Sequence, residues 1–255
     1  MPSTSSDDLG SVLLEQKPRR AMIGNGIFLF VVALPFLLVP AAPSAPIEVK
    51  IGLFLFGAGL ATFALVMLWR HWMHVFLHEH GIREYRQRRG RRLRFDDVDE
   101  VIYSSLRLFS HGSYIHTIQK LALKSDRMSG PPLVCTHVFR EQDGRANGET
   151  TTPLVNVRDA LSLQLAERMS QRLTRGEAVE WVPRLRLRTR CMEFDDRGRV
   201  ELIEWRRVSK LDIDQGMFRL WLDAEPKPFL TAPTHIVNFY PAYCLAMRLF
   251  HGVPQ

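Results

Sequence analysis

The sequence predicts a membrane-embedded helical hairpin followed by an α+β region made of two related units of antiparallel strands, each closed by a C-terminal helix. Three observations lead to this fold class. Residues 21–47 and 51–69 contain no charged side chain. Short β-prone runs alternate with polar turns in the rest of the chain. Residues 81–103 match residues 191–213 without gaps at an offset of 110, which indicates a repeat.

The hairpin is predicted to occupy residues 21–70. Ala21–Ala42 and Ile51–Trp69 each approach the roughly 20 apolar residues that cross a hydrocarbon core. The connection between them is short and contains proline, so we expect the two helices to run antiparallel. Residues 1–20 are rich in serine and have no net charge, and we expect them to form a disordered tail.

Small residues in the second span, Gly57, Gly59 and Ala61, are expected to let the two helices approach closely. Pro35 and Pro40 are expected to kink or shorten the first helix.

Basic residues flank the outer ends of the hairpin and orient it. Lys17, Arg19 and Arg20 precede the first span, and Arg70 follows the second, whereas the connecting turn holds only Lys50. Because short cytoplasmic segments carry an excess of Lys and Arg, both flanks and both chain termini are expected in the cytoplasm.

Two other interpretations of the apolar segments remain open. The basic KPRR followed by an apolar core and small residues near Ala41 also fits a cleaved signal peptide. In that case the second span still anchors the protein. The third interpretation, two buried core helices, is disfavoured because nothing else in the chain is large enough to cover them.

The match is consistent with a shared fold, because apolar residues occupy equivalent positions in the two copies. Leu93 falls on Ile203, Phe95 on Trp205, Val98 on Val208 and Val101 on Leu211. Such positions are those that a strand, turn and strand would bury.

An amphipathic helix is expected after each match. The first opens at Asn156 as its N-cap and ends before Gly176, and the second opens at Asn238 and ends before Gly252. The predicted domains are therefore residues 75–175 and residues 178–252. The second is shorter by about a quarter, which leaves open whether it has the full number of strands or borrows packing from the first.

Phe95–Val101 and Trp205–Leu211, the single closing helices and the N-terminal hairpin together resemble bacterial membrane proteins with tandem pleckstrin-homology-like (PH-like) domains. The resemblance implies two PH-like bent antiparallel sheets or barrels, each closed by a C-terminal helix. It also implies a multi-pass protein of the bacterial inner (cytoplasmic) membrane.

The net charge of +7 is concentrated in one turn. Residues 83–94 contain one glutamate and seven arginines, which are Arg83, Arg86, Arg88, Arg89, Arg91, Arg92 and Arg94. We expect these arginines to contact anionic lipid headgroups, because cytoplasmic basic clusters near a membrane are attracted to them. The resemblance implies that this is the turn between the first two strands, where phosphoinositide-binding relatives keep their basic residues.

Three interpretations of the arginines stay open. They can merely enforce the orientation of the hairpin, they can bind anionic phospholipid, or they can bind nucleic acid. Nucleic acid is disfavoured because Tyr85 is the only aromatic residue among them. The expected partners are therefore the lipid bilayer, an anionic phospholipid and, in the alternative, another membrane protein.

Two further features are candidate sites. His71, His74 and His78 would share one face if the second span continued as a helix, and would then form a weak metal site. The more conservative interpretation places them at headgroup depth beside Trp69 and Trp72. The apolar Leu106, Leu108 and Phe109 near a hairpin tip at 106–112 suggest contact with membrane or a partner, or ordinary strand packing.

The sequence contains no phosphate-binding loop, nucleophile elbow or paired C-x-x-C. We therefore expect no catalytic residues and no cofactor, and a dispersed active site remains the alternative. The function expected is that of a membrane-anchored cytoplasmic binding or scaffold module. The leading alternative is an accessory subunit that binds another membrane protein without lipid specificity.

Overall fold

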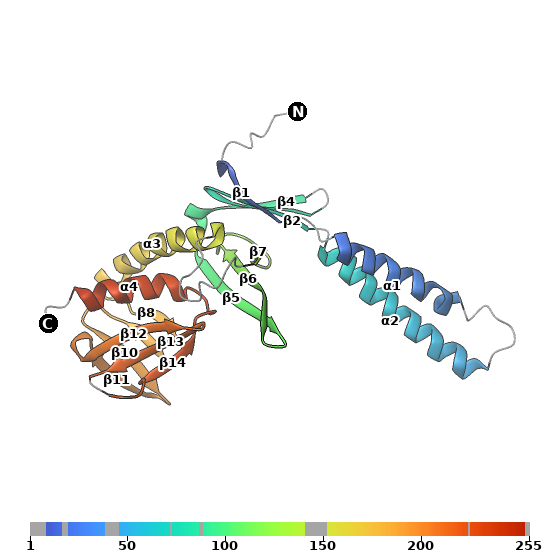
Figure 1. Cartoon of the computed structure of the whole chain (residues 1–255). Coiled ribbons are helices and arrows are strands. Elements are labelled where there is room, and N and C mark those ends of the chain that lie inside the picture. The colour runs from blue at the N-terminus through green and yellow to red at the C-terminus, as the bar shows by residue number, and fades with distance from the viewer. Residues whose placement is uncertain are drawn as a thin grey trace. The chain divides into compact units, whose positions relative to one another are not determined.

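The computed structural model describes residues 9–16, 20–38, 46–71, 73–86, 89–140, 152–223 and 225–252 (Figure 1). Within these ranges the fold is mixed α+β, with four antiparallel sheets and four α-helices. The sheets stay open, so the barrels that the sequence allowed as an alternative are not formed.

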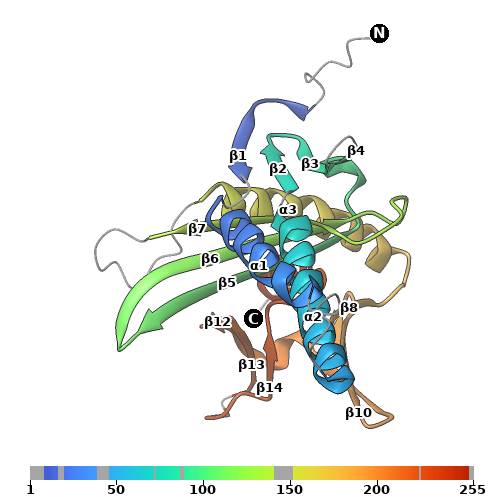
Figure 2. The ribbon, with the colours of Figure 1, turned by 90° about the vertical axis from the view of Figure 1, so that its right-hand side faces the viewer.

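Helices α1 (Arg20–Leu38) and α2 (Ile47–His71) form the expected antiparallel hairpin (Figure 2). Within α2, Ile47–Val66 is long and apolar enough to cross a membrane, whereas the apolar part described in α1, Ile27–Leu38, is shorter. The two-span expectation is therefore supported for one of its helices by length and composition. Pro35 lies inside α1, and Pro40 lies outside the described residues.

Small residues line the contact between α1 and α2. A Cβ atom on Gly57 would lie 2.8 Å from the Cβ atom of Phe36, and Ala33, Ala61 and Ala64 are buried. Gly59 differs, because a Cβ atom there would meet nothing within 4 Å. The prediction of close helix packing is confirmed at Gly57 and Ala61 and is wrong at Gly59.

In the described residues, the N-terminal repeat contains seven strands and, apart from the helical hairpin, one α-helix. Its first sheet has the order β1-β2-β3-β4, formed by Val12–Gln16, Met73–His78, Gly81–Arg86 and Arg89–Arg94. The short 3₁₀ helix η3 (Phe95–Asp97) leads to a second sheet, β5-β6-β7, formed by Glu100–Ser110, Ser113–Lys124 and Leu133–Phe139. Helix α3 (Pro153–Thr174) follows.

The position of β1 corrects two expectations. Residues 12–16 were expected in a disordered tail spanning residues 1–20, yet they form a strand, and Leu9 is buried. Because β1 precedes the hairpin and β2 follows it, the repeat begins before residue 21 rather than at residue 75. The helical hairpin is thus inserted between two neighbouring strands of one sheet.

The C-terminal repeat follows the same order of elements. Its first sheet consists of β8 (Val179–Val182), β9 (Leu185–Leu187), β10 (Cys191–Asp196) and β11 (Arg199–Glu204). After η4 (Trp205–Arg207), the second sheet has the order β12-β13-β14, formed by Val208–Asp214, Met217–Leu222 and Leu230–Pro233, and α4 (Phe239–His251) closes the repeat.

The offset of 110 is confirmed by the element boundaries. Adding 110 to the limits of β3, β4 and η3 gives the limits of β10, β11 and η4. The shorter repeat has the full number of strands. Part of the difference in length arises because β12 and β13 span 7 and 6 residues, against 11 and 12 for β5 and β6. Helix α4 is also shorter, with 13 residues against 22 for α3.

The turn at the centre of each match is stabilised in the same way. The N–H of Val98 donates to the carbonyl of Phe95, and the N–H of Val208 donates to that of Trp205. Val98 and Val208 are both buried. The Phe or Trp followed three residues later by Val therefore marks a 3₁₀ turn between the two sheets of each repeat.

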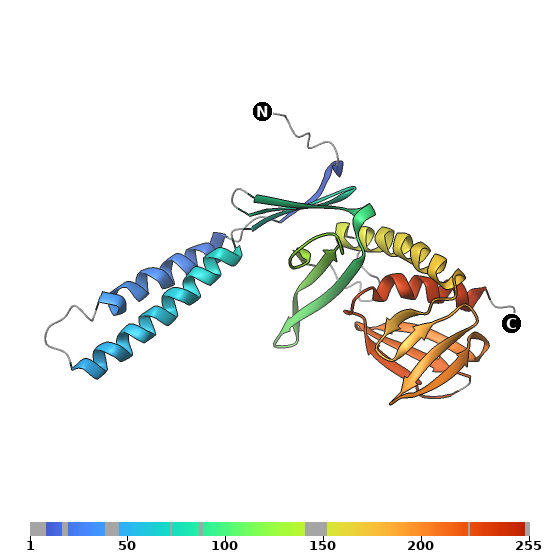
Figure 3. The ribbon, with the colours of Figure 1, turned by 180° about the vertical axis from the view of Figure 1, so that it is seen from behind.

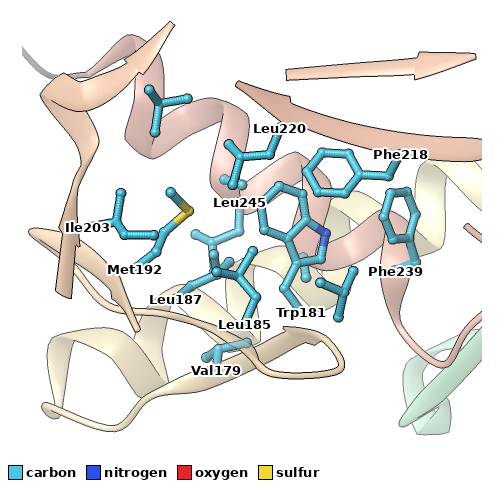
Figure 4. Packing of buried hydrophobic residues seen from close by; sticks show 14 of the residues in the cluster. Val179, Trp181, Leu185, Leu187, Met192, Ile203, Phe218, Leu220, Phe239 and Leu245 are labelled. Carbon is cyan, nitrogen blue, oxygen red and sulfur yellow. The ribbon is translucent and has the colours of Figure 1, made fainter. Parts of the chain in front are cut away.

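The core of the C-terminal repeat is aromatic at its centre. Trp181 and Phe218 have ring centroids 4.4 Å apart, and Phe239 packs against both (Figure 4). Helix α3 of the preceding repeat contributes Ala166, Met169 and Leu173 to the same cluster. The C-terminal repeat therefore has the full set of seven strands, and its hydrophobic core also includes side chains from helix α3 of the N-terminal repeat.

Helices α3 and α4 lie side by side and join the two repeats (Figure 3). The side chain of Asn238 accepts from the N–H of Val101 at 2.8 Å and donates to the carbonyl of Asp99 at 3.0 Å. Its own N–H donates to the carbonyl of Val101 at 2.8 Å. Asn238 thus satisfies the edge of β5 rather than capping α4 with its side chain.

A buried arginine reinforces the same junction. The guanidinium of Arg158 in α3 lies 4.8 Å from the ring centroid of Tyr103 and 4.4 Å from that of Tyr240. Its charge is paired with Asp159, whose Oδ1 atom accepts from Nε at 2.8 Å. The guanidinium faces two aromatic rings and pairs with one carboxylate. Together these contacts offset the free-energy cost of burying its charge.

The N-cap of α3 is Thr152, whose hydroxyl accepts from the N–H of Val155. The sequence expectation placed this cap at Asn156, which instead lies exposed inside the helix. The proline at the first helical position explains the earlier start, since its ring fixes the φ of a first turn and it has no N–H to satisfy.

We predict that Gly57→Val weakens the helical hairpin by about 1–3 kcal/mol, because the added side chain must displace Phe36 and the backbone of Leu37. Gly59→Val is the matched control, since its side chain enters open space. Titrating the full chain in detergent with a denaturing surfactant measures the unfolding midpoint of each. Equal midpoints for the two variants would contradict the packing described.

We predict that Asn238→Ala destabilises the chain by about 3 kcal/mol. The side-chain hydrogen bonds to Val101 and Asp99 are lost at about 1 kcal/mol each, and alanine is strained at the left-handed φ of 55°. Asn156→Ala removes the same side chain from an exposed helical position and is expected to change nothing measurable. Thermal unfolding of both variants in detergent compares them. The junction would be energetically unimportant if both melted like the parent chain.

Candidate functional site

Sheet topology determines where the arginine-rich run lies. At one edge of the first sheet, the N–H of Glu79 donates to the carbonyl of Ser11, and the N–H of Phe95 donates to the carbonyl of His80. These bonds bring together the start of β1, the β2–β3 turn and the end of β4. The opposite edge must therefore hold the end of β1, the start of β2, the end of β3 and the start of β4.

That opposite edge is where the chain enters and leaves the helical hairpin. Helix α1 begins a few residues after β1, and α2 ends at His71, two residues before β2. Arg83–Arg92 accordingly belong to the same compact body as Leu14–Leu77. We call the ends of β1–β4 at this edge, with Arg86 and Arg89 as the nearest described arginines, the basic edge.

Arg91 has a structural partner. Its guanidinium lies 2.5 Å from the carboxylate of Glu84, which is only 6% exposed. A buried carboxylate that lost this arginine would keep an uncompensated charge, which is costly. Arg91 is therefore assigned to the stability of the sheet rather than to a ligand.

The outer face of β3 and β4 carries the arginines that remain accessible. Ile82, Glu84 and Leu93 are buried, so strand alternation places Arg83 and Arg92 on the other face, where Arg92 is exposed. The Arg83 guanidinium lies 4.3 Å from the ring centroid of Tyr85. The ring centroids of Tyr85 and Phe76 are 5.7 Å apart.

The other candidate arginines lie at opposite ends of strand β4, at the end of β3 or in the connection between these strands. Arg94 lies at the end of β4 away from the basic edge, and its guanidinium is 3.9 Å from the exposed carboxylate of Asp96. Arg88 lies outside the described residues, as do the side chains of Arg86 and Arg89. Of the seven predicted arginines, Arg91 has a carboxylate partner that is buried and Arg94 has one that is exposed. Headgroup contact by the set stays a prediction.

The connection that carries the arginines is not the one that the family resemblance implied. It joins β3 to β4, whereas the connection between the first two strands of the sheet contains the helical hairpin. The expectation of a first turn rich in basic residues is therefore wrong. The reason is that β1 lies before the hairpin, where sequence analysis expected no strand.

The equivalent turn of the C-terminal repeat has its charges compensated. Asp196 pairs with Arg184, and Glu201 lies 3.8 Å from Arg207. The carboxylate of Asp195 accepts from the N–H of Gly198 at 2.7 Å. Acidic and basic side chains therefore both occur at this turn, and it has no excess of positive charge.

The histidines do not share a helical face. Helix α2 ends at His71, and His74 and His78 lie in strand β2. His78 is buried, and its Nδ1 atom lies 3.1 Å from the carbonyl oxygen of Gly10. Among the residues that the structure describes, no group of three or more potential ligands is arranged to hold a metal ion.

The three cysteines are protonated thiols at neutral pH. Burial raises the pKa of Cys135 to about 12. Burial also raises the pKa values of Cys191 and Cys244 above the usual value for cysteine. Since the thiolate is the nucleophilic form, none of these side chains is activated for covalent catalysis.

Sequence analysis missed how the N-terminal segment holds the first sheet together. The hydroxyl of Ser11 donates to Glu79 at 2.6 Å, and its N–H donates to the same carboxylate at 3.2 Å. These bonds lower the pKa of Glu79. The available signal was the short apolar run at Val12–Leu14, which lacks the length to stand out in a polar segment.

The geometry therefore brings together a hairpin with one membrane-length helix and an arginine-bearing sheet edge beside its two ends. No protein-family model and no curated protein matches the chain.

Proposed function

We propose that the chain is a membrane-anchored cytoplasmic binding module of the bacterial inner membrane, in which α1 and α2 both span the bilayer and the basic edge contacts anionic lipid headgroups. In this proposal the two repeats are PH-like domains, and neither has a catalytic role. The observation that carries it is the shared location of the arginines and the two hairpin ends at one edge of one sheet.

The surface of the hairpin supports the membrane assignment. Large apolar side chains such as Phe28, Leu38, Ile47 and Leu55 point outward, while glycine and alanine fill the contact between the helices. A water-soluble helix pair buries its large apolar residues instead. Small residues inside and large ones outside are the pattern of helices packed within lipid.

The pairing of β1 with the sheet supports an uncleaved hairpin. A signal peptide cut near Ala41 would release β1, which neighbours β2. It would also remove Ser11 from its bonds with Glu79. The signal-peptide interpretation is therefore disfavoured, and both chain ends are assigned to one side of the membrane.

The family resemblance is supported at the level of topology. Among the described residues, each repeat has a four-stranded and a three-stranded antiparallel sheet followed by a helix. Antiparallel strands closed by one C-terminal helix are what the resemblance implies. The alternatives are an accessory subunit that binds another membrane protein through these repeats and, as a lesser one, an enzyme with dispersed catalytic residues.

We predict that Arg88→Asn with Arg89→Asn lowers the preference of the full chain for anionic over neutral phospholipid. Each basic residue near a membrane surface contributes about 1 kcal/mol, so two correspond to about 30-fold at most. Native mass spectrometry of the detergent-solubilised chain, titrated with phosphatidylglycerol or phosphatidylcholine, measures the preference. Arg91 is left unchanged because it pairs with buried Glu84.

The matched control is Arg197→Asn with Arg199→Asn, which removes the same charge from the equivalent turn of the C-terminal repeat. Asparagine suits the left-handed φ of 54° at Arg197. This control is expected to keep the parent preference. If both pairs lowered it equally, net charge would be its cause, and the headgroup assignment would be overturned.

We predict that reporters fused before Met1 and after Gln255 both act as cytoplasmic. A fluorescent protein that folds only in the cytoplasm is expected to be bright at either end, and a phosphatase that requires the periplasm is expected to be inactive. Opposite sides for the two ends would leave a single span, and the proposal of a spanning hairpin would then be abandoned.

A further inference from the structure

Strands β5 and β6 extend beyond the rest of their sheet (Figure 2). Strand β7 pairs with residues 117–123 of β6, and these face residues 101–107 of β5, so residues 108–116 form a two-stranded projection. We call this projection, together with the adjoining Ser105–Arg107, the β5–β6 arm. The arm closes at His111 and Gly112, whose φ angles are 49° and 80°. Two left-handed residues make the tight turn whose twist matches that of paired strands.

Large apolar side chains on the arm are exposed. Leu106 is 57% exposed, Phe109 is 61% exposed and Ile115 is 43% exposed. Leu106 pairs with Ile118 on the face opposite Tyr103 and Leu121, which are buried, whereas strand alternation places Phe109 on their face. Ile115 lies at an irregularity in the pairing, next to Tyr114. Apolar side chains therefore project from both faces of the arm.

The charge of the arm has one sign. Residues 104–123 contain Arg107, Lys120 and two histidines but no aspartate or glutamate. This contrasts with η3 and the residues between it and β5, where Asp96, Asp97 and Asp99 cluster. The arm itself contains one charged residue, Arg107, and no acidic one. Exposed apolar side chains beside a positive charge are complementary to the interface of an anionic bilayer, where headgroups attract the charge and acyl chains accept the apolar groups.

We infer that the β5–β6 arm is a second membrane-binding element, which inserts Phe109 and Ile115 end-on into the interface of an anionic bilayer and brings Leu106 and Arg107 to its surface. End-on insertion covers both faces of the arm at once, whereas a partner protein packed on one face would leave the other exposed. A two-stranded hairpin is marginal in water, so burial of its tip also orders it.

This inference rests on the proposed function, because a hairpin that anchors the chain in the bilayer raises the effective concentration of every other part of the chain at the membrane. The contact then needs little affinity of its own. Its consequence is that the repeats are held against the membrane at two places, the basic edge and the arm, rather than at one.

The experiment uses the full chain in lipid nanodiscs, with Cys191→Ser and Cys244→Ser, so that buried Cys135 is the only native thiol left. An environment-sensitive fluorophore is attached at Ser113→Cys at the arm's tip, or at Ser129→Cys in the exposed turn at the opposite end of the same sheet. Discs contain phosphatidylcholine alone or with phosphatidylglycerol, and some lipids carry a quencher on the acyl chain.

We predict a blue-shifted emission and acyl-chain quenching at residue 113 in anionic discs, neither of which occurs at residue 129. Leu106→Ser with Phe109→Ser is expected to abolish both effects. Val200→Ser with Leu202→Ser, which changes two side chains that are each 60% exposed on β11, is expected to leave them intact. The substituted residues are exposed, so unfolding midpoints are expected to stay at the parent value.

Water-like emission at residue 113 in anionic discs overturns the inference. The inference also fails if the blue shift occurs in native membrane vesicles but not in discs of pure lipid, because the arm then binds a protein. Loss of the chain from the discs, or an unchanged lipid preference after the Arg88 and Arg89 substitutions, counts against the proposed function instead. The two failures are thereby distinguished.

Discussion

The structure depends on the pairing of β1 with β2 across the inserted helical hairpin. Adjacent antiparallel strands bring the end of β1 and the start of β2 to one sheet edge, so the hairpin must leave and return at that edge. The connection from β3 to β4 returns to it as well. One topological constraint therefore fixes both the antiparallel course of α1 and α2 and the location of the arginines.

The same constraint separates arginines that stabilise the sheet from arginines available to a ligand. Arg91 points to the inner face and compensates buried Glu84, whereas Arg92 is on the outer face of the same strand. In the C-terminal repeat, ion pairs such as Arg184 with Asp196 occupy the equivalent turn. Two repeats with the same order of elements thus carry different surfaces, and within the described residues the helical hairpin belongs to the N-terminal one.

Much of the fold could be predicted from the sequence because its signals are local. The apolar segments and the spacing of Phe95 and Val98, repeated at Trp205 and Val208, each report on a few consecutive residues. Strand β1 could not be predicted, because five residues in a polar segment become a strand only through a partner 60 residues away. The roles of Asn238 and Arg91 depend on contacts of the same long-range kind.

We propose that the basic edge lies at the membrane surface. The most direct test of this placement compares the two edges of the first sheet. Spin labels are placed at Gly90→Cys, beside the basic edge, and at Asp96→Cys, in η3 just past the other end of β4. About 13 Å of strand, from Gly90 to Arg94, lies between them. In nanodiscs, relaxation by a paramagnetic metal chelated to lipid headgroups is predicted to be strong at residue 90 and weak at residue 96. Equal relaxation at both positions, or stronger relaxation at residue 96, would contradict the account.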